Sequence, residues 1–203
     1  MSSDTDIANE AMQLLKARRI TSLTDGSDGA NAANDVFTSV RDRLLRKHNW
    51  NFATRQQKLA KSSTVPVFQF DNAYPLPADW LRTVSVHDND AGAGRLRYRE
   101  EEVDNQGVIV TSADELWIRY IYRVTDPNRM AADFVAAFAL ALAVAIPGVS
   151  NIAAGALAEL RAEAKTALRE AKHSDAVGSM PETRPLGSWH DSRHGYPDRA
   201  WPD

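Results

Sequence analysis

Apolar residues recur at helical spacing at the start of the chain. They predict two helices, one that carries Ile7 to Leu15 on its apolar face and has Lys16, Arg18 and Arg19 at its end, and a second that ends near residue 48. The positions that carry this prediction are spaced mostly by three or four residues: Ile7, Ala11, Leu14 and Leu15, and then Ala33, Phe37, Val40 and Leu44. Acidic residues begin the first helix and basic residues end it, an order that suits the helix dipole.

Two further helices are predicted after residue 125. Asp126-Pro127 supplies an N-cap and a first-turn proline for the third helix, which runs to Ile146. Ser150 caps a fourth helix that ends near His173. Residues 134–158 carry no charge, but the dense apolar run covers only 13 residues, whereas a bilayer span needs about 20. The third helix is therefore predicted to be a buried core helix and not a membrane span.

Between residues 53 and 125 the pattern changes to a period of two, which is typical of strands. Five segments either alternate or are rich in β-branched residues, and turn residues separate them. These segments are residues 65–70, 81–86, 95–99, 108–111 and 116–123. The region is therefore predicted to form a small antiparallel sheet or barrel.

The order of these elements predicts an α+β fold. Its simplest packing is a four-helix bundle interrupted by a small antiparallel β domain, with an extended C-terminal tail. The predicted helical part comprises residues 1–52 and 126–173, and the inserted β domain comprises 53–125. Residues 174–203 are rich in proline, glycine and serine and have no apolar stripe, which predicts the tail.

Composition narrows the possible chemistry. The 203 residues include 24 Lys and Arg, 27 Asp and Glu, and no cysteine, with a formal net charge of -3. The near balance argues against a dominant polyanion-binding surface, and the lack of thiols excludes disulfides, thiolate metal sites and a cysteine nucleophile. No nucleophile elbow, phosphate-binding glycine loop or complete calcium loop is present. We therefore expect a protein that is not an enzyme and uses no cofactor and no metal.

The predicted tail is unusually aromatic. It carries Trp189, Tyr196 and Trp201, which we interpret as anchors for a partner surface, with an inert tail as the alternative. His190 and His194 are four residues apart, but no acidic partner is fixed near them, so we interpret them as a chance pair.

One stretch of the chain is strongly basic. Residues 41–61 contain a single acid, Asp42, and seven basic residues: Arg41, Arg43, Arg46, Lys47, Arg55, Lys58 and Lys61. This stretch could contact nucleic acid or an acidic protein face. The alternative is a solvated face that other parts of the chain neutralise.

The fourth helix sorts its residues by face. At about 100° per residue, its apolar sector holds Leu157, Leu160, Ala164, Leu168 and Ala171. A basic sector holds Arg161, Lys165, Arg169 and Lys172, and an acidic sector holds Glu159, Glu163 and Glu170. Like charges four residues apart are unfavourable unless a partner supplies the opposite sign. Either other elements of the chain neutralise both sectors, or copies meet head to tail, acidic face on basic face.

Several short motifs occur in an order that resembles a known family. They are Ile7-Ala-Asn-Glu-Ala11 with Leu14-Leu15, Ile20 to Asp25, Val40 to Leu45, Trp50-Asn-Phe-Ala-Thr-Arg55, and Ala73-Tyr-Pro-Leu-Pro-Ala-Asp-Trp-Leu-Arg82. Over about residues 6–172 the chain resembles the head–tail adaptors of tailed bacteriophages, also called tail tubular protein A or gatekeeper proteins. Lys16 stands where a small residue is expected, and the Pro/Trp tail lies outside the shared pattern.

This resemblance implies a structural virion protein. Such adaptors form a ring, usually of twelve copies, beneath the portal protein, extend the DNA channel and dock the tail tube or nozzle protein. The implied location is the head–tail junction of the virion, with host cytoplasm during assembly, no membrane, and packaged DNA contacted without sequence readout. The C-terminal segment would lie along the portal, and the basic residues from Arg41 to Lys58 would face the channel. An alternative is a nucleic-acid-binding module that uses residues 41–61. The Trp50 and Tyr74 motifs are interpreted as fold signatures and not as contact sites.

Overall fold

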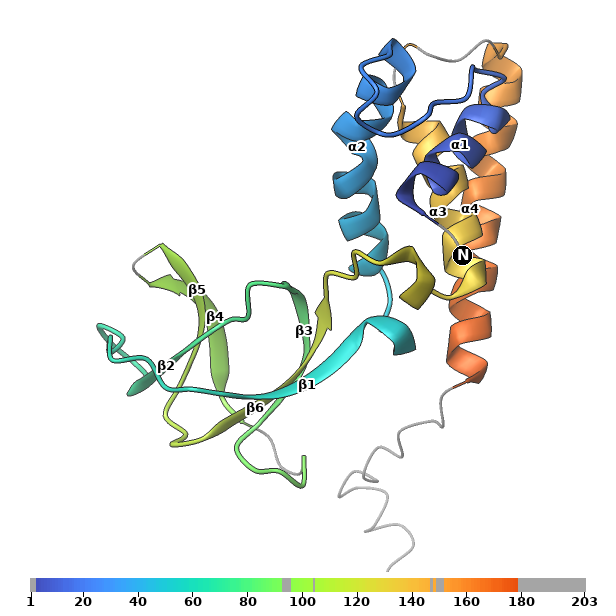
Figure 1. The fold of residues 1–203 in the computed structure, drawn as a ribbon. Coiled ribbons are helices and arrows are strands. Elements are labelled where there is room, and N and C mark those ends of the chain that lie inside the picture. The colour runs from blue at the N-terminus through green and yellow to red at the C-terminus, as the bar shows by residue number, and fades with distance from the viewer. Residues whose placement is uncertain (1–2, 93–95, 104, 147, 149–151, 179–203) are drawn as a thin grey trace, which may run out of the picture.

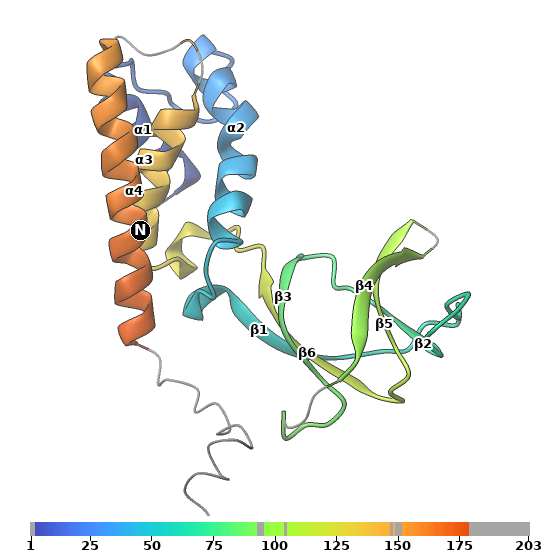
Figure 2. The ribbon, with the colours of Figure 1, turned by 180° about the vertical axis from the view of Figure 1, so that it is seen from behind.

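The computed structural model describes residues 3–178 apart from 93–95, 104, 147 and 149–151 (Figures 1 and 2). These residues form four α-helices, two short 3-10 helices and six strands. The helices are α1 (Asp4–Leu14), α2 (Asp28–Leu45), α3 (Ala132–Ala145) and α4 (Ala154–Val177), with 3-10 turns η1 (Asn51–Ala53) and η2 (Pro127–Arg129). The strands are β1 (Thr54–Leu59), β2 (Asn72–Pro75), β3 (Trp80–His87), β4 (Tyr98–Val103), β5 (Gln106–Thr111) and β6 (Leu116–Tyr122).

Side-chain caps fix where the first two helices begin. The Ser3 hydroxyl accepts a hydrogen bond from the backbone N–H of Asp6 at 3.1 Å, and the Asp6 carboxylate accepts from the N–H of Ser3 at 2.9 Å. This reciprocal pair is a capping box. Ser27 caps α2 through the N–H of Ala30. The first helix begins at Asp4, with acids in its first turn as predicted. It ends at Leu14, before the basic residues predicted at its end, because Lys16 takes a left-handed backbone with φ 52°.

The prediction that the third helix is a core helix is confirmed. Along α3, one face buries six residues: Phe134, Ala137, Phe138, Ala139, Leu142 and Ala143. Within the described residues, no helix combines the length and apolar character needed to cross a bilayer. The predicted start of the third helix was wrong, however. Asp126 and Pro127 open the 3-10 turn η2, in which Asp126 accepts from the N–H of Asn128, and α3 begins only at Ala132.

The strands form two antiparallel three-stranded sheets, ordered β1-β6-β3 and β2-β5-β4. Predicted strands 81–86, 108–111 and 116–123 are found as β3, β5 and β6, and the strand predicted at 95–99 begins later, as β4. The prediction missed β1 and β2. It also placed a strand at 65–70 where the chain forms a loop, with Val67 98% and Phe68 75% exposed.

The predicted four-helix bundle interrupted by a small β domain is wrong. The structure is a mixed α+β fold of four helices and two three-stranded sheets. The helices do not surround a core of their own: α3 lies in the middle, packing on α1, α2 and α4, whereas α1 and α2 barely meet. The hydrophobic core also continues into the β part, because Phe134 and Phe138 belong to the same buried cluster as Ile118 and Tyr120 of β6.

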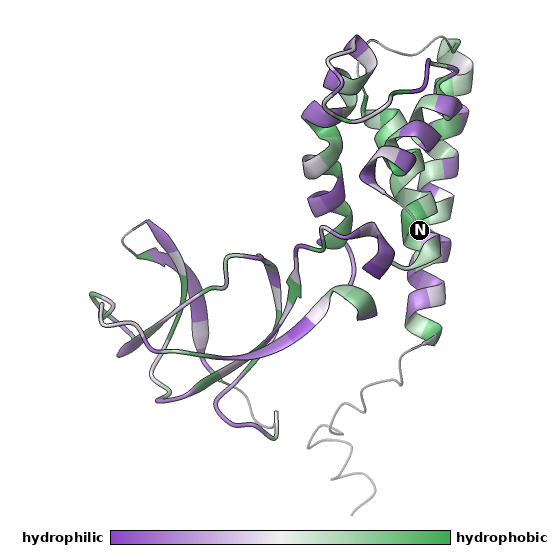
Figure 3. Cartoon of the chain, in the orientation of Figure 1, coloured by the Kyte–Doolittle hydropathy of each residue, from purple (hydrophilic) through white to green (hydrophobic). Residues whose placement is uncertain are grey.

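The second sheet adds a small separate cluster. Tyr74 and Ile109 point into the main core, whereas Phe70, Val108 and Val110 pack on the opposite face of the sheet. Figure 3 shows purple, hydrophilic residues along much of α4 and of the sheet edges. Of the predicted tail, residues 174–177 belong to α4, which ends at Val177, and residues 179–203 lie outside the described residues.

Candidate functional site

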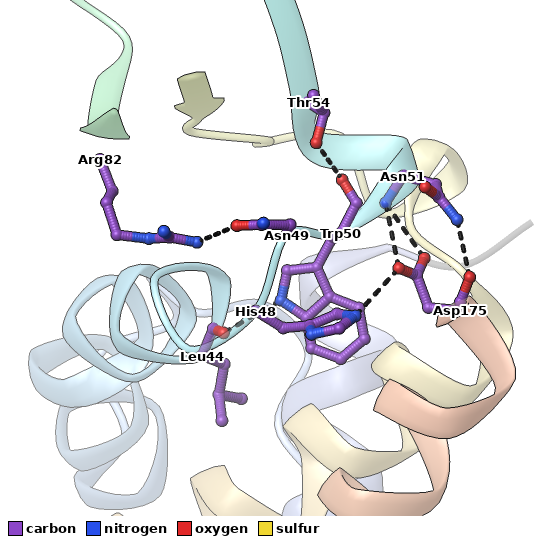
Figure 4. Close-up of polar contacts among 8 residues, drawn as sticks. All are labelled: Leu44, His48, Asn49, Trp50, Asn51, Thr54, Arg82 and Asp175. Atoms are coloured by element: carbon purple, nitrogen blue, oxygen red, sulfur yellow. Dashed lines mark hydrogen bonds and ion pairs between the residues drawn. The ribbon is translucent and has the colours of Figure 1, made fainter. Parts of the chain in front are cut away.

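The corner between α2 and β1 is built around Trp50 (Figure 4). Its side chain is fully buried, and its indole N–H donates to the backbone oxygen of Leu44 at 3.1 Å. The ring meets Phe134 edge to face, with the centroids 5.0 Å apart. The Leu44 carbonyl near the end of α2 also accepts from the backbone N–H of Lys47 at 3.1 Å, so the indole adds a second hydrogen bond to it. The Trp50 motif is therefore part of the fold, as the sequence interpretation expected.

A second set of contacts joins this corner to the end of α4. Both carboxylate oxygens of Asp175 accept from the backbone N–H of Asn51, at 3.1 and 3.2 Å. The Asn51 amide donates to the backbone oxygen of Asp175 at 2.7 Å, and the Nε2 atom of His48 lies 3.3 Å from the carboxylate (Figure 4). We call this set the Asp175 clasp. It fixes the last turn of α4, and so the point from which residues 179–203 continue.

The second family-like motif, Ala73 to Arg82, is also structural. The Tyr74 hydroxyl donates to the backbone oxygen of Ala113 at 2.7 Å, and burial raises the pKa of this phenol. Asp79 pairs with Arg55 and accepts from the Tyr120 hydroxyl at 3.1 Å. Burial, together with the charge of Asp79, raises the pKa of Tyr120, so this hydroxyl keeps its proton. The Tyr74 hydroxyl thus joins β2 to the turn before β6, and Asp79 joins β1 and β6.

The basic stretch is largely neutralised within the chain. Four of its seven cations face an acid: Arg41 with Asp42 at 3.4 Å, Arg55 with Asp79, Lys58 with Glu115 at 2.7 Å, and Lys61 with Asp114 at 3.1 Å. The Arg41 side chain is only 7% exposed. Burial raises the pKa of the Asp4 carboxyl, and the positive charge of Arg41 acts in the opposite direction. The Arg41 side chain is thus buried within this chain, and its place beside a channel stays a prediction.

Three predicted channel residues do lie at the surface. Arg43, Arg46 and Lys47 are exposed at the C-terminal end of α2, and no ion pair to them is found within the described residues. Arg55 and Lys58 lie on β1 and contact the rings of Tyr122 and Trp117. The basic stretch thus contributes cations both to the end of α2 and to β1.

The charged residues of α4 are presented to solvent. The predicted apolar sector packs along α3, with Leu160 and Ala171 fully buried. Six of the seven candidate interface residues are exposed and Lys172 is half-buried; the exposed ones are Glu159, Arg161, Glu163, Lys165, Arg169 and Glu170. In the described part of the chain, no ion pair neutralises any of them. The described part of the chain therefore supplies no opposite charge to either charged sector of α4.

The predicted portal anchors Trp189, Tyr196 and Trp201, and the pair His190 and His194, lie outside the described residues. Among the residues that are described, no three His, Asp or Glu side chains gather in a way that could hold a metal ion.

One polar surface was not predicted from the sequence. Pairing of β1, β6 and β3 places three cross-strand rows on one face of the first sheet, which we call the outer face: Lys58–Trp117–His87, Gln56–Arg119–Ser85 and Thr54–Ile121–Arg82. No acid stands in these rows. The alternation of Trp117, Arg119 and Ile121 was visible in the sequence, but only the strand register shows which residues of β1 and β3 lie beside them.

Comparison with known proteins adds no relative: no family model matches the sequence, and no curated protein matches it.

Proposed function

We propose that this chain is a head–tail adaptor of a tailed bacteriophage. In this proposal, copies form a ring beneath the portal, extend the DNA channel and present a docking surface to the next tail protein. The observation that carries the proposal is the surface of α4. A 24-residue helix in which only Leu160 and Ala171 are buried exposes its sorted charges, and such a surface suits contact between copies.

The structural motifs support the same proposal. The stretches that resemble the adaptor family occupy the two junctions that determine this fold: the α2–β1 corner around Trp50, and the segment from Tyr74 to Arg82 between the sheets. Proteins that share a fold need the residues that hold its junctions, whereas their contact surfaces can differ. The residues that carry the resemblance are of the first type, since they hold the Trp50 corner and the Tyr74–Arg82 segment in place.

The segment after α4, residues 179–203, starts from a fixed point. Because the Asp175 clasp ties the end of α4 to the corner that follows α2, the aromatic segment leaves from beside Asn51. We propose that Trp189, Tyr196 and Trp201 anchor it on the portal. The double variant Trp189→Ala with Trp201→Ala is expected to bind portal at least tenfold more weakly, with unchanged circular dichroism and melting temperature.

Mass photometry of the chain mixed with purified portal tests this function. A portal particle that gains the mass of a ring, with about twelve copies expected from the family resemblance, supports the adaptor. Portal whose mass does not change at micromolar chain contradicts it. The aromatic double variant then separates the anchor idea from the ring, because portal binding at wild-type strength by that variant contradicts only the anchors.

A nucleic-acid-binding module is the second candidate. It now rests on Arg43, Arg46 and Lys47, which form an exposed basic group on consecutive turns at the end of α2. Such a group contacts phosphates without reading sequence, so binding should weaken steeply with salt. Tight, salt-dependent binding of duplex DNA by the free monomer, lost in Arg43→Glu with Arg46→Glu, would favour this candidate over the adaptor.

A further inference from the structure

α4 forms one edge of the helical part by itself. Figures 1 and 2 show α4 and α2 at opposite edges, with α3 between them. Among the described elements, α3 is the one that packs along α4, and the Asp175 clasp adds a contact at the last turn. Most of the circumference of this helix, which has 24 residues and a length of about 36 Å, is therefore open to another molecule.

The two charged sectors of α4 lie on opposite sides of its buried sector. At about 100° per residue, the basic sector is centred about 95° to one side of the residues that pack on α3, and the acidic sector about 120° to the other side. The remaining face points away from α3. It carries a strip of exposed residues without Lys, Arg, Asp or Glu, which we call the middle strip: Gly155, Ala162, Thr166 and His173. α4 thus presents positive charge along one flank and negative charge along the other.

Opposite charges stand at nearly equal heights along the two flanks. Each acid of the acidic sector is one or two residues from a cation of the basic sector: Glu159 from Arg161, Glu163 from Lys165, and Glu170 from Arg169. At 1.5 Å per residue, the heights of the two groups differ by about 3 Å or less. Residues one or two apart do not face each other within a helix, so these charges cannot pair in their own copy. In two parallel α4 helices that stand side by side without a shift, they do face each other.

We propose that the α4 helices of neighbouring copies pack side by side and parallel, acidic sector on basic sector, and form the wall of the ring's channel. The proposal rests on the adaptor function and names the partner of the α4 surface, which is α4 of the next copy. The middle strip then faces the channel, and α3 lies behind the wall. This placement differs from the one that the resemblance implies for Arg43, Arg46 and Lys47, which lie on α2 at the opposite edge of the helical part.

The dimensions of a helix suit such a wall. The axes of packed helices lie about 8–10 Å apart. A circle of the twelve helices that the resemblance implies then has a radius of about 15–19 Å, and with side chains that reach about 5 Å from each axis the opening is about 20–28 Å across. A B-form duplex passes through an opening of this width. Because α4 stands alone at its edge, the other helices lie further out, where a ring gives each copy more room.

The arrangement of the charges also distinguishes between modes of pairing. Two α4 helices packed antiparallel, middle strip on middle strip, bring like sectors together, which is unfavourable. A parallel pair in this face-to-face mode matches the signs, but its contact is isologous and ends at two copies. Side-by-side packing also matches the signs, and it joins two different surfaces, as a closed ring requires.

Charge reversal with a matched control tests the contact. Glu163→Lys places a cation opposite Lys165 of the next copy, so the yield of rings on portal in electron microscopy should fall at least tenfold. The control is Asp35→Lys, which makes the same change of net charge at an exposed position of α2 and should leave the yield unchanged. Adding Lys165→Glu to Glu163→Lys restores opposite signs and should restore rings. A full yield of rings from Glu163→Lys alone would overturn the proposal.

Cysteine cross-linking gives a second readout that does not depend on charge. Because the chain has no cysteine, every disulfide comes from introduced thiols. Helix axes about 8–10 Å apart bring facing Cα atoms into the range of about 4–7 Å in which a disulfide forms. On assembled rings, Glu163→Cys with Lys165→Cys should give a ladder of linked copies under mild oxidation, and each single variant should stay monomeric on the gel. A linked dimer from Ala162→Cys alone would show that two copies pack face to face and would contradict the wall.

The outcomes distinguish this proposal from the adaptor function itself. Rings that form on portal without a cross-linked ladder overturn the α4 wall and leave the adaptor function standing. Failure of the wild-type chain to form rings overturns both. A map of the ring in which α2, and not α4, borders the channel gives that place to the cations of α2, and the proposal is then wrong although the adaptor function holds.

Discussion

Removal of the Asp175 carboxylate should loosen the whole molecule, although this residue lies on the last turn of α4. The side chain is 7% exposed and joins α4 to a corner 124 residues earlier in the sequence. In Asp175→Ala, the backbone N–H of Asn51 loses its charged acceptor and His48 loses its neighbour.

The expected cost follows from these contacts. A hydrogen bond to a charged acceptor contributes about 1.5–3 kcal/mol. The pair with His48, which is 26% exposed, adds up to about 1 kcal/mol. Removing an anion near a helix C-terminus returns about 0.5 kcal/mol. The free energy of unfolding should therefore fall by about 2–3 kcal/mol, which corresponds to about 4–10 °C in melting temperature for a chain of this size.

Urea unfolding followed by circular dichroism measures this change. Glu170→Ala is the matched control, because it removes an exposed acid from the same helix and should change the free energy by less than about 0.5 kcal/mol. Asp175→Asn should fall between the two, since its amide oxygen still accepts from Asn51. If Asp175→Ala unfolds at the same urea concentration as the wild type, the clasp does not hold α4 and the reasoning is refuted.

Three further predictions concern other parts of the chain. Val67→Ser with Phe68→Ser should change the free energy of unfolding by less than about 1 kcal/mol in urea titrations, since both side chains are exposed. Hydrogen bonds, chiefly from Ser27, lower the pKa of Asp25. The ionised carboxylate therefore adds stability above pH 4, and this stability is lost as the pH falls further. The melting temperature of Asp25→Ala should decline less between pH 4 and pH 2 than that of the wild type. Arg169→Glu should impair ring formation on portal if α4 contacts a neighbouring copy; a full yield of rings in sedimentation would show that it does not.

The elements that the sequence predicted well are those whose burial is periodic. Phe134 and Phe138 mark α3 because one continuous face of that helix is buried. By contrast, β1 reads Thr-Arg-Gln-Gln-Lys-Leu and is exposed over most of its length, so no apolar alternation marks it as a strand. The segment from Val65 to Phe70 has the alternation of a strand but includes Pro66, and it pairs with neither sheet. Local pattern therefore reports burial, and fails where a strand is exposed over most of its length.

The candidate surfaces were predictable only in part. Helical geometry alone placed Arg161, Lys165 and Arg169 on one face of α4, and the structure exposes them. Burial of Arg41 could not be predicted from the sequence, because it depends on the tertiary packing around α2. The joining of Lys58 and Arg119 on one face depends on the register between β1 and β6, which is set by the folded core.

Electron microscopy of the wild-type chain mixed with purified portal tests the central claim most directly. The account predicts a closed ring of this chain seated on one end of the portal, coaxial with its channel, and absent from portal alone. Portal particles without added density, at chain concentrations well above micromolar, would contradict the adaptor function.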